Sequence, residues 1–180
     1  MELTVWTIGH STRPLDEFLA LLEQNRISAI VDVRRFPGSR RYPQFGSEAL
    51  NASLAAQAIT YRWMPELGGR RRALPDSANK AWKSAAFRGY ADYMQTAEFE
   101  AAFTGLLEFA ARQSTCLMCA EAVWWRCHRS LIADALKSRR VRVLHILAAN
   151  NLAEHPYTAP ARIVDGKLTY AVDELELPAS

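Results

Sequence analysis

Three consecutive residues, Cys127-His128-Arg129, combine a potential nucleophile, a proton acceptor and a cation. They follow a predicted strand and its loop and lie near the start of a predicted helix, where backbone N–H groups and the helix dipole favour anions. A cysteine in such a position can have a lowered pKa. Three interpretations stay open. Cys127 is a nucleophile with His128 as its base, His128 and Arg129 hold an anion, or Cys127 packs beneath the helix while its neighbours bond to nearby loops.

Glu121 and His10 are candidates for proton transfer. Glu121 follows a buried predicted strand, and Trp124 and Trp125 come soon after it. If these rings partly exclude water from the carboxyl group, its pKa rises and it can serve as a general acid or base. An ion pair with a nearby arginine is the alternative. His10 lies in the turn after the first predicted strand, where it either transfers protons or caps a helix.

The remaining cysteines resemble a Cys-x-x-Cys motif, Cys116-Leu-Met-Cys119, but their spacing argues against redox or metal chemistry between them. On a strand, residues three apart point to opposite faces. Their Cα atoms lie roughly 10 Å apart, beyond the ~7 Å limit for a disulfide. We expect Cys116 in the core, and Cys119 either in the core or in a pocket wall. A cysteine-phosphatase loop needs an arginine six positions after the cysteine, and Trp125 stands there.

Apolar patterns and turn signals predict the elements that position these residues. β-Branched and apolar runs predict strands over residues 3–8, 27–33, 59–63, 115–119 and 141–147. Helical spacing and capping residues predict helices from Pro14 through about Leu22 and over about 47–57, 79–94, 96–112 and 126–138. Asp165-Gly166 predicts a tight hairpin turn between 162–164 and 167–172. Alternating strands and helices imply right-handed crossovers. We therefore expect one α/β domain over 1–180, with a mainly parallel sheet of about five strands flanked by helices and a C-terminal β-hairpin.

Ligands of open parallel sheets bind beyond the carboxyl ends of the strands, so the segments after the strands form the candidate site. We expect His145 to be a core residue and His155 to be exposed. The catalytic candidates are Glu121, His10, His128 and Cys127. The substrate-binding candidates are Ser11, Asp32, Arg34, Ser39, Arg40, Glu66, Gly68, Gly69, Cys119 and Arg129. No spacing matches a zinc signature. No cofactor is predicted, although several of these residue types can bind a divalent metal.

The charge distribution indicates an anionic partner. Residues 26–90 contain 12 Lys or Arg against 4 Asp or Glu, and 18 of the 22 basic residues are Arg, whose planar fork suits phosphates and carboxylates. A small anionic ligand is the expected partner. A nucleic acid is the alternative, held by Arg40-Arg41-Tyr42 and Arg70-Arg71-Arg72 with Trp63 and Trp82 as stacking rings.

Composition narrows the class of protein. With 49% hydrophobic and 23% charged residues the chain is typical of a globular protein. No apolar run approaches the roughly 20 residues of a membrane span, and no secretory signal is visible. Three cysteines favour a reducing compartment. We therefore expect a cytoplasmic protein with no membrane partner, and the sequence does not fix its oligomeric state.

Several stretches resemble, in order, an uncharacterised bacterial family, the domain of unknown function 488. They are Thr7-Ile8-Gly9-His10-Ser11, Asp32-Val33-Arg34 with Pro37 and Ser39, Tyr61 with Glu66-Leu67-Gly68-Gly69, Phe87-Arg88-Gly89-Tyr90-Ala91 with Tyr93-Met94, and Met118-Cys119-Ala120-Glu121 with Cys127-His128-Arg129. The resemblance implies a compact α/β domain and brings no established activity. From the residues we hypothesise a hydrolase or transferase acting on a small anionic, phosphorylated or nucleotide-like substrate. The alternatives are a nucleic-acid-binding or processing module that uses the basic 34–88 region, and a non-catalytic ligand sensor.

Overall fold

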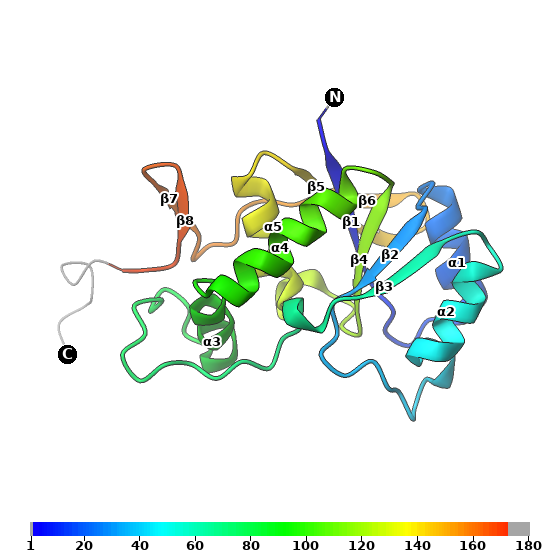
Figure 1. The fold of residues 1–180 in the computed structure, drawn as a ribbon, viewed down its shortest axis with the longest axis horizontal. Coiled ribbons are helices and arrows are strands. Elements are labelled where there is room, and N and C mark those ends of the chain that lie inside the picture. The colour runs from blue at the N-terminus through cyan, green and yellow to red at the C-terminus, as the bar shows by residue number, and fades with distance from the viewer. Residues whose placement is uncertain (1, 173–180) are drawn as a thin grey trace.

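A six-stranded sheet lies at the centre of the computed structural model, which describes residues 2–172 (Figure 1). The strands are β1 (Thr4–Gly9), β2 (Ala29–Asp32), β3 (Thr60–Trp63), β4 (Thr115–Cys119), β5 (Arg142–Ala148) and β6 (Asn151–Glu154). Their order across the sheet is β3-β2-β4-β1-β5-β6. The first five are parallel, as predicted, and β6 runs antiparallel to β5 at one edge. Sequence reasoning missed β6, which follows a tight turn at Asn150, where φ is 54°.

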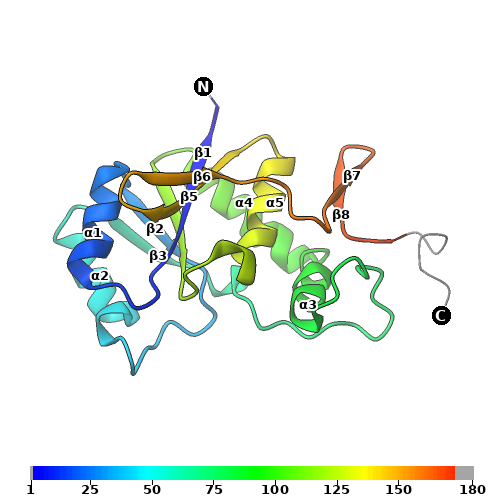
Figure 2. The ribbon, with the colours of Figure 1, turned by 180° about the vertical axis from the view of Figure 1, so that it is seen from behind.

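Helices cover both faces of the sheet. They are α1 (Leu15–Gln24), α2 (Ser47–Ala55), α3 (Ala85–Tyr93), α4 (Ala97–Ala110) and α5 (Arg129–Ser138). The first two pack on one face, and the other three pack on the opposite face, as seen from both sides in Figures 1 and 2. Among residues 2–172, no helix is both long and apolar enough to cross a membrane.

Strand alternation assigns the side chains of β4 to two separate cores. Cys116 packs with Phe18, Leu22 and other residues on the face covered by α1 and α2. Cys119 packs on the other face, in the cluster that includes Leu131 of α5. The prediction that the two cysteines face opposite ways is therefore confirmed, as is the core position of Cys116, which is fully buried.

Two predicted helices are shorter than expected. The segment 79–94 is helical only over Ala85–Tyr93, because Asp92 holds the preceding loop in an irregular conformation. Its carboxylate accepts hydrogen bonds from the Ser77 hydroxyl, the Asn79 amide and the Leu74 backbone N–H, at 2.5, 2.8 and 2.8 Å. The last predicted helix begins at Arg129 instead of residue 126, since Trp124–Arg126 forms a separate 3-10 turn.

The C-terminal hairpin forms where the sequence predicts it. Strands β7 (Arg162–Val164) and β8 (Lys167–Thr169) pair in antiparallel fashion around Asp165 and Gly166, which have φ values of 50° and 76°. The second strand is shorter than predicted. Tyr170 leaves the hairpin, and its hydroxyl donates to Asp134 of α5 at 2.8 Å. This contact ties the C-terminal segment to the helix that begins beside the candidate site.

Candidate functional site

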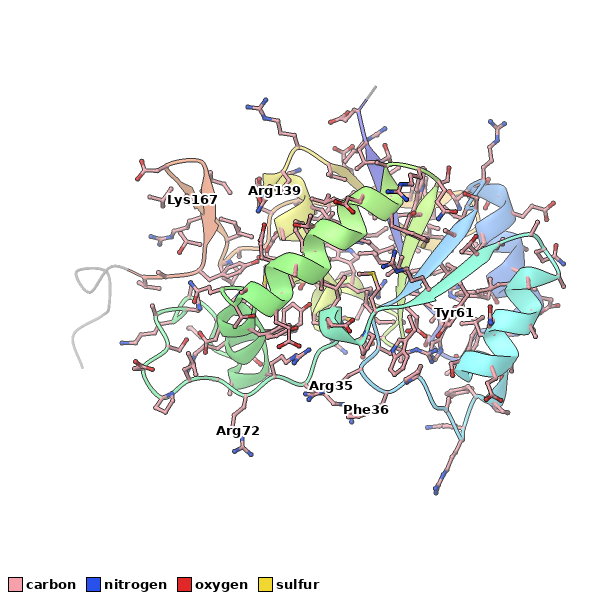
Figure 3. All side chains as sticks on the ribbon, viewed as in Figure 1. Arg35, Phe36, Tyr61, Arg72, Arg139 and Lys167 are labelled. Atoms are coloured by element: carbon pink, nitrogen blue, oxygen red, sulfur yellow. The ribbon has the colours of Figure 1, made fainter. Side chains whose placement is uncertain are left out.

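The carboxyl ends of three neighbouring strands, β1, β2 and β4, open into a cleft of about 820 Å³. The cleft is lined by four arginines but by a single acidic residue, Glu121. This excess of positive charge makes the cleft electropositive. The arginines are Arg34, Arg35, Arg70 and Arg126. Arg35 and Phe36 extend outward side by side at its rim (Figure 3). A cleft of this size and charge fits a small anionic ligand.

Cys127 lies on the floor of the cleft, where three hydrogen-bonding groups surround its sulfur. Cys119, the last residue of β4, places its Sγ 2.9 Å from the Cys127 Sγ. His128 Nδ1 lies 3.5 Å away, and the backbone N–H of Arg129 donates to the sulfur at 3.4 Å. Because Cys127 lies just before His128, the N-cap residue of α5, the helix dipole adds to this favourable environment for negative charge.

The hydrogen bonds of His128 fix which of its nitrogens carries the proton. Nε2 lies 3.0 Å from the Val33 carbonyl oxygen, which can only accept, so Nε2 carries a hydrogen. In the neutral ring Nδ1 is then a proton acceptor, and it faces the Cys127 sulfur. A Cβ at Gly69 would lie 2.9 Å from Nδ1, so only glycine lets the loop pack this closely against the ring. Nδ1 of His128 is therefore the ring nitrogen that faces the Cys127 sulfur.

Arg129 is a buried cation with no carboxylate partner among residues 2–172. It is 1% exposed, donates from Nη1 to the Thr7 hydroxyl and from Nη2 to the Glu121 carbonyl, and leaves Nε unpaired. A buried charge without a counter-charge is strongly unfavourable. Burial alone would lower the pKa of Arg129, but the neighbouring sulfurs of Cys119 and Cys127 raise it. These sulfurs are the groups that can supply the negative charge.

The pKa values of the two neighbouring thiols, Cys119 and Cys127, are shifted in opposite directions. Burial by itself would raise the pKa of Cys127. The hydrogen bond from Cys119, the contact with His128 and the positive charge of Arg129 outweigh it and hold that pKa well below the ordinary value of a thiol. Burial and the bond to Cys127 raise the pKa of Cys119. Cys127 is thus the thiolate of the pair, and Cys119 keeps its proton and donates it to that thiolate.

A second polar cluster holds Arg34 at the edge of the cleft. Its Nε and Nη2 donate to the two oxygens of Asp32 at 2.8 and 2.6 Å, and Tyr61 also donates to Asp32, at 2.7 Å. Asp32 is fully buried and does not line the cleft. The expectation that it binds a substrate is not supported by this position, because both oxygens are already occupied. Asp32 positions Arg34.

His10 is likewise committed to Arg34. Its Nδ1–H donates to the Ser11 carbonyl at 3.0 Å, so Nε2 is left to accept from Arg34 Nη1 at 3.2 Å. Burial lowers the pKa of His10 to about 4, with the charge of Arg34 adding to the effect. The ring is therefore neutral near pH 7, and it has no free nitrogen with which to accept a proton from a substrate. His10 lines the cleft as an orienting residue.

The prediction that Trp124 and Trp125 partly exclude water from the Glu121 carboxyl group is wrong. Glu121 is exposed where it lines the cleft, and no tryptophan lines the cleft beside it. Trp124 stacks on His145, with ring centroids 4.4 Å apart, and Trp125 is 54% exposed. The argument for a carboxyl group shielded from water therefore does not hold. Glu121 contributes its backbone carbonyl to Arg129 and leaves its carboxylate in solvent at the mouth of the cleft.

The other candidates divide into those that line the cleft and those that do not. Ser11, Ser39, Gly69 and Cys119 line it. Four candidates lie outside the lining of the cleft: Arg40, Glu66, Gly68 and Arg129. Of these, Arg40 and Glu66 are exposed on other parts of the surface. The prediction that His155 is exposed is wrong, because the residue is 1% exposed and forms hydrogen bonds with His145 and Asp134. His145 is buried, as predicted.

Sequence reasoning missed several residues that line the cleft. Arg35, Phe36 and Arg126 belong to it although none was among the candidates, and Arg70, which was predicted only for a nucleic-acid groove, belongs to it as well. The basic runs that contain them and the turn at Pro37-Gly38 were visible signals. Exposed loop side chains carry no periodicity, however, so the sequence gives no basis for choosing among adjacent arginines.

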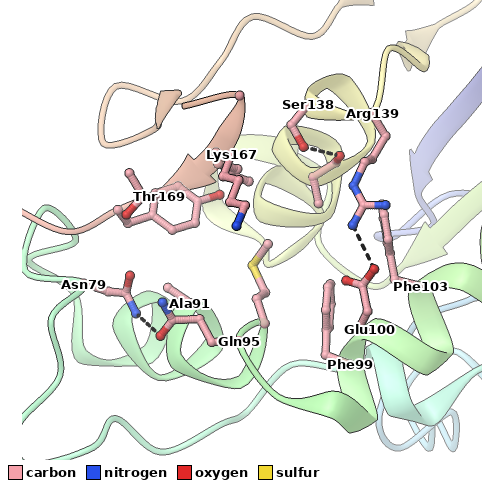
Figure 4. A pocket seen from close by; sticks show the side chains of 15 residues that line it. Asn79, Ala91, Gln95, Phe99, Glu100, Phe103, Ser138, Arg139, Lys167 and Thr169 are labelled. Atoms are coloured by element: carbon pink, nitrogen blue, oxygen red, sulfur yellow. Dashed lines mark hydrogen bonds and ion pairs between the residues drawn. The ribbon is translucent and has the colours of Figure 1, made fainter. Parts of the chain in front are cut away.

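A smaller cavity of about 200 Å³ lies between α3, α4, α5 and the C-terminal hairpin (Figure 4). Four of its polar side chains pair with one another. Arg139 contacts Glu100 at 2.8 Å, and Asn79 donates to Gln95 at 3.2 Å. None of the residues that line it is a cysteine or a histidine. In the described part of the chain, no group of three or more His, Cys, Asp or Glu side chains is arranged to hold a metal ion.

Together the sheet and the cleft define an α/β protein with a paired cysteine at the carboxyl edge of a mainly parallel sheet. The chain belongs to the family described as "Domain of unknown function DUF488", whose model matches residues 14–136. That match confirms the resemblance and contains Arg34, Cys119, Cys127 and His128, whereas the Thr7–Ser11 stretch lies outside it. No curated protein and no solved structure matches the chain.

Proposed function

We propose that this protein is a hydrolase or transferase that attacks a small anionic substrate with the thiolate of Cys127. The observation that carries the proposal is the position of the Cys127 sulfur. It faces Nδ1 of His128, lies beside a buried arginine for which residues 2–172 provide no carboxylate partner, and forms the floor of an arginine-lined cleft. Activated nucleophiles in enzymes are recognised by this combination of an adjacent base and a stabilising positive charge.

The reaction divides into two steps. In the first, the Cys127 sulfur forms a bond to the electrophilic centre, for example a phosphorus atom, while the bond to the leaving oxygen breaks. The leaving oxygen takes the proton that His128 had accepted from the thiol. In the second step, water, or an acceptor hydroxyl in a transferase, gives its proton to His128 and attacks the same centre, and the Cys127 thiolate leaves.

The residues at the rim of the cleft favour a phosphorylated or nucleotide-like substrate. The guanidinium of Arg34 makes three hydrogen bonds to Asp32 and His10, and a guanidinium has five N–H donors, which leaves donors for an anion. Phe36 is 65% exposed, and Arg35 and Arg70 lie 5.7 and 5.8 Å from its ring. An exposed ring with flanking cations suits a planar base that carries a phosphate.

Substitution of Cys127 tests the proposal. A library of nucleotides and phosphate esters is screened by thermal shift, because a ligand at 100 times its dissociation constant stabilises a protein by about 2.7 kcal/mol. Turnover of the hits is then measured. We expect Cys127→Ala to lower kcat by about 10³-fold or more and His128→Asn by about 10²-fold or more. Cys116→Ala, a change on the opposite face of the sheet, keeps turnover. Full activity in Cys127→Ala would overturn the proposal, and binding without turnover would instead support a ligand sensor.

A nucleic acid strand is the second candidate ligand, favoured by the same exposed Phe36 between two arginines. The groove expected from the sequence is reduced, however. Trp82 packs against Phe87 and Tyr170, and Arg71 lies over the Tyr93 ring at 3.6 Å. This function predicts binding of single-stranded oligonucleotides that weakens steeply with salt and with Phe36→Ala. Undetectable binding at low salt would exclude it.

A further inference from the structure

Cys119 and Cys127 are adjacent across the floor of the cleft, and no step of the proposed catalysis uses Cys119 as a reactant. Their sulfurs are 2.9 Å apart, so closure to a bond of about 2.05 Å requires a movement of about 1 Å. Cys119 ends β4, whereas Cys127 lies in extended backbone between a 3-10 turn and α5, with φ −129° and ψ 149°. A short irregular segment therefore carries one of the two sulfurs and can take up the movement.

We propose that Cys119 and Cys127 form a reversible disulfide when a hydroperoxide enters the cleft. Both residues line it, so a small oxidant reaches the sulfurs although they are only 3% and 6% exposed. The third cysteine has no such position. Cys116 is fully buried on the other face of the sheet and does not line the cleft.

The oxidation occurs in two balanced steps. The Cys127 thiolate attacks one oxygen of the hydroperoxide and the O–O bond breaks, so that Cys127 becomes a sulfenic acid. The leaving oxygen takes the proton that His128 had accepted from the Cys127 thiol and departs as an alcohol, or as water when the oxidant is hydrogen peroxide. The Cys119 sulfur then attacks the Cys127 sulfur, and the hydroxyl group leaves with the Cys119 proton as water. Two electrons pass from the sulfurs to the peroxide. Two equivalents of a small thiol reverse the reaction by exchange and are themselves oxidised to a disulfide.

The charges around the pair make this disulfide easy to reduce. The reduced form holds a thiolate beside Arg129, a buried cation that donates to no carboxylate within residues 2–172. Oxidation removes that negative charge and leaves the guanidinium unpaired. Stabilisation of the thiolate therefore favours the dithiol form, as in dithiol proteins that are strong oxidants. The disulfide also withdraws Cys127 from His128. It would switch off catalysis, and that consequence rests on the proposed function, whereas the disulfide itself does not.

Thiol titration of the full chain tests the inference without any substrate. The reduced protein is treated with equimolar hydrogen peroxide, and free thiols are counted after denaturation. We expect the wild type and Cys116→Ala to lose two thiols together and to regain them with dithiothreitol. We expect Cys127→Ala to lose thiols at least ~tenfold more slowly. Cys119→Ala should stop at a sulfenic acid on Cys127 that dimedone labels.

Peptide mapping of the oxidised wild type under non-reducing conditions gives a second readout that needs no variant. We expect one cross-linked species that joins the peptides containing residues 119 and 127. A link that includes Cys116, or three thiols that all persist after peroxide treatment, would overturn the inference. The two proposals fail separately. An absent disulfide with activity lost in Cys127→Ala rejects only the switch, and a disulfide with full activity in Cys127→Ala rejects only the catalytic role.

Discussion

Asp32 is the residue on which the position of Arg34 depends. It is fully buried, its two oxygens accept from Arg34 Nε and Nη2, and Tyr61 donates to the same carboxylate. Removing one partner of a buried ion pair leaves the other charge without compensation. The Asp32 carboxylate therefore holds the guanidinium of Arg34 in one orientation at the cleft.

We expect Asp32→Asn to lower the free energy of unfolding by about 3–5 kcal/mol, because it leaves the Arg34 charge unpaired. Tyr61→Phe is the matched control, since it removes only one hydrogen bond to the same carboxylate. It should lower the free energy by about 1.5–3 kcal/mol. Urea unfolding measures both. Equal effects of the two changes would contradict the ion-pair interpretation.

The residues that meet at the cleft could be anticipated, but their partners could not. His10, Arg34 and Cys127 each follow a predicted strand or its loop, and Cys119 ends one, so the parallel sheet brings all four to one edge. Which donor faces which acceptor depends on rotamers and loop paths that leave no periodic signal in a sequence. For this reason the turn of His10 toward Arg34 and the exposure of Glu121 were both missed.

At the level of elements, the loop after β4 packs unusually close to β1. His10 N–H donates to the Cys119 carbonyl and Ser11 N–H to the Ala120 carbonyl, at 2.9 and 3.0 Å. A Cβ at Gly9 would lie 1.8 Å from the Glu121 carbonyl oxygen, which is itself the acceptor for Arg129. Glycine at this position lets the loop hold Arg129 beside Cys127.

We expect Gly9→Ala to lower the free energy of unfolding by several kcal/mol, roughly 2–4, because the loop must move away and Arg129 loses an acceptor. Gly105→Ala is the control. A Cβ at that position of α4 meets nothing within 4 Å, and replacing glycine inside a helix stabilises it by about 0.5–1 kcal/mol. Opposite signs in chemical denaturation are the expected outcome. A stable Gly9→Ala variant would show that the loop does not need this close approach.

The element boundaries that sequence reasoning missed share a cause. Apolar runs predicted β1 to β5, and helical periodicity predicted most of the helices, because these segments pack into the two apolar cores on either side of the sheet. The residues before α3 are instead held by Asp92, and β6 pairs through a turn at Asn150. Both depend on particular polar contacts between segments, which a pattern of apolar residues does not encode.

Across the whole molecule, buried hydrogen bonds connect the C-terminal segment to the cleft. Asp134 accepts from Tyr170 and pairs with His155, whose ring contacts His145 at 2.9 Å. His145 in turn bonds to the Thr7 hydroxyl, which accepts from Arg129 beside the two cysteines. The chain of contacts crosses α5, β5 and β1, so the position of the buried arginine depends on elements distributed over most of the fold.

Two buried histidines, His145 of this network and His10 beside Arg34, make the stability of the whole molecule sensitive to acid. Burial lowers the pKa of His145 to about 2 and that of His10 to about 4, from an ordinary value of 6.5. Below pH 6.5 the unfolded chain therefore binds protons that the folded chain does not, and stability falls as the pH falls. Asp92 does not contribute in this range, since its pKa is lowered from 3.8.

Between pH 6.5 and 5 we expect each of these two histidines to remove about 1–2 kcal/mol from the free energy of unfolding. His145→Gln eliminates one of the two titrating groups, so the variant should lose about half of the pH dependence, whatever its stability at pH 7. Urea unfolding at a series of pH values measures the slope for both proteins. The comparison uses slopes because the substitution also breaks contacts to Thr7 and His155, which lowers stability at every pH. Parallel slopes in the two proteins would mean that His145 takes up its proton in the folded state as readily as in the unfolded chain.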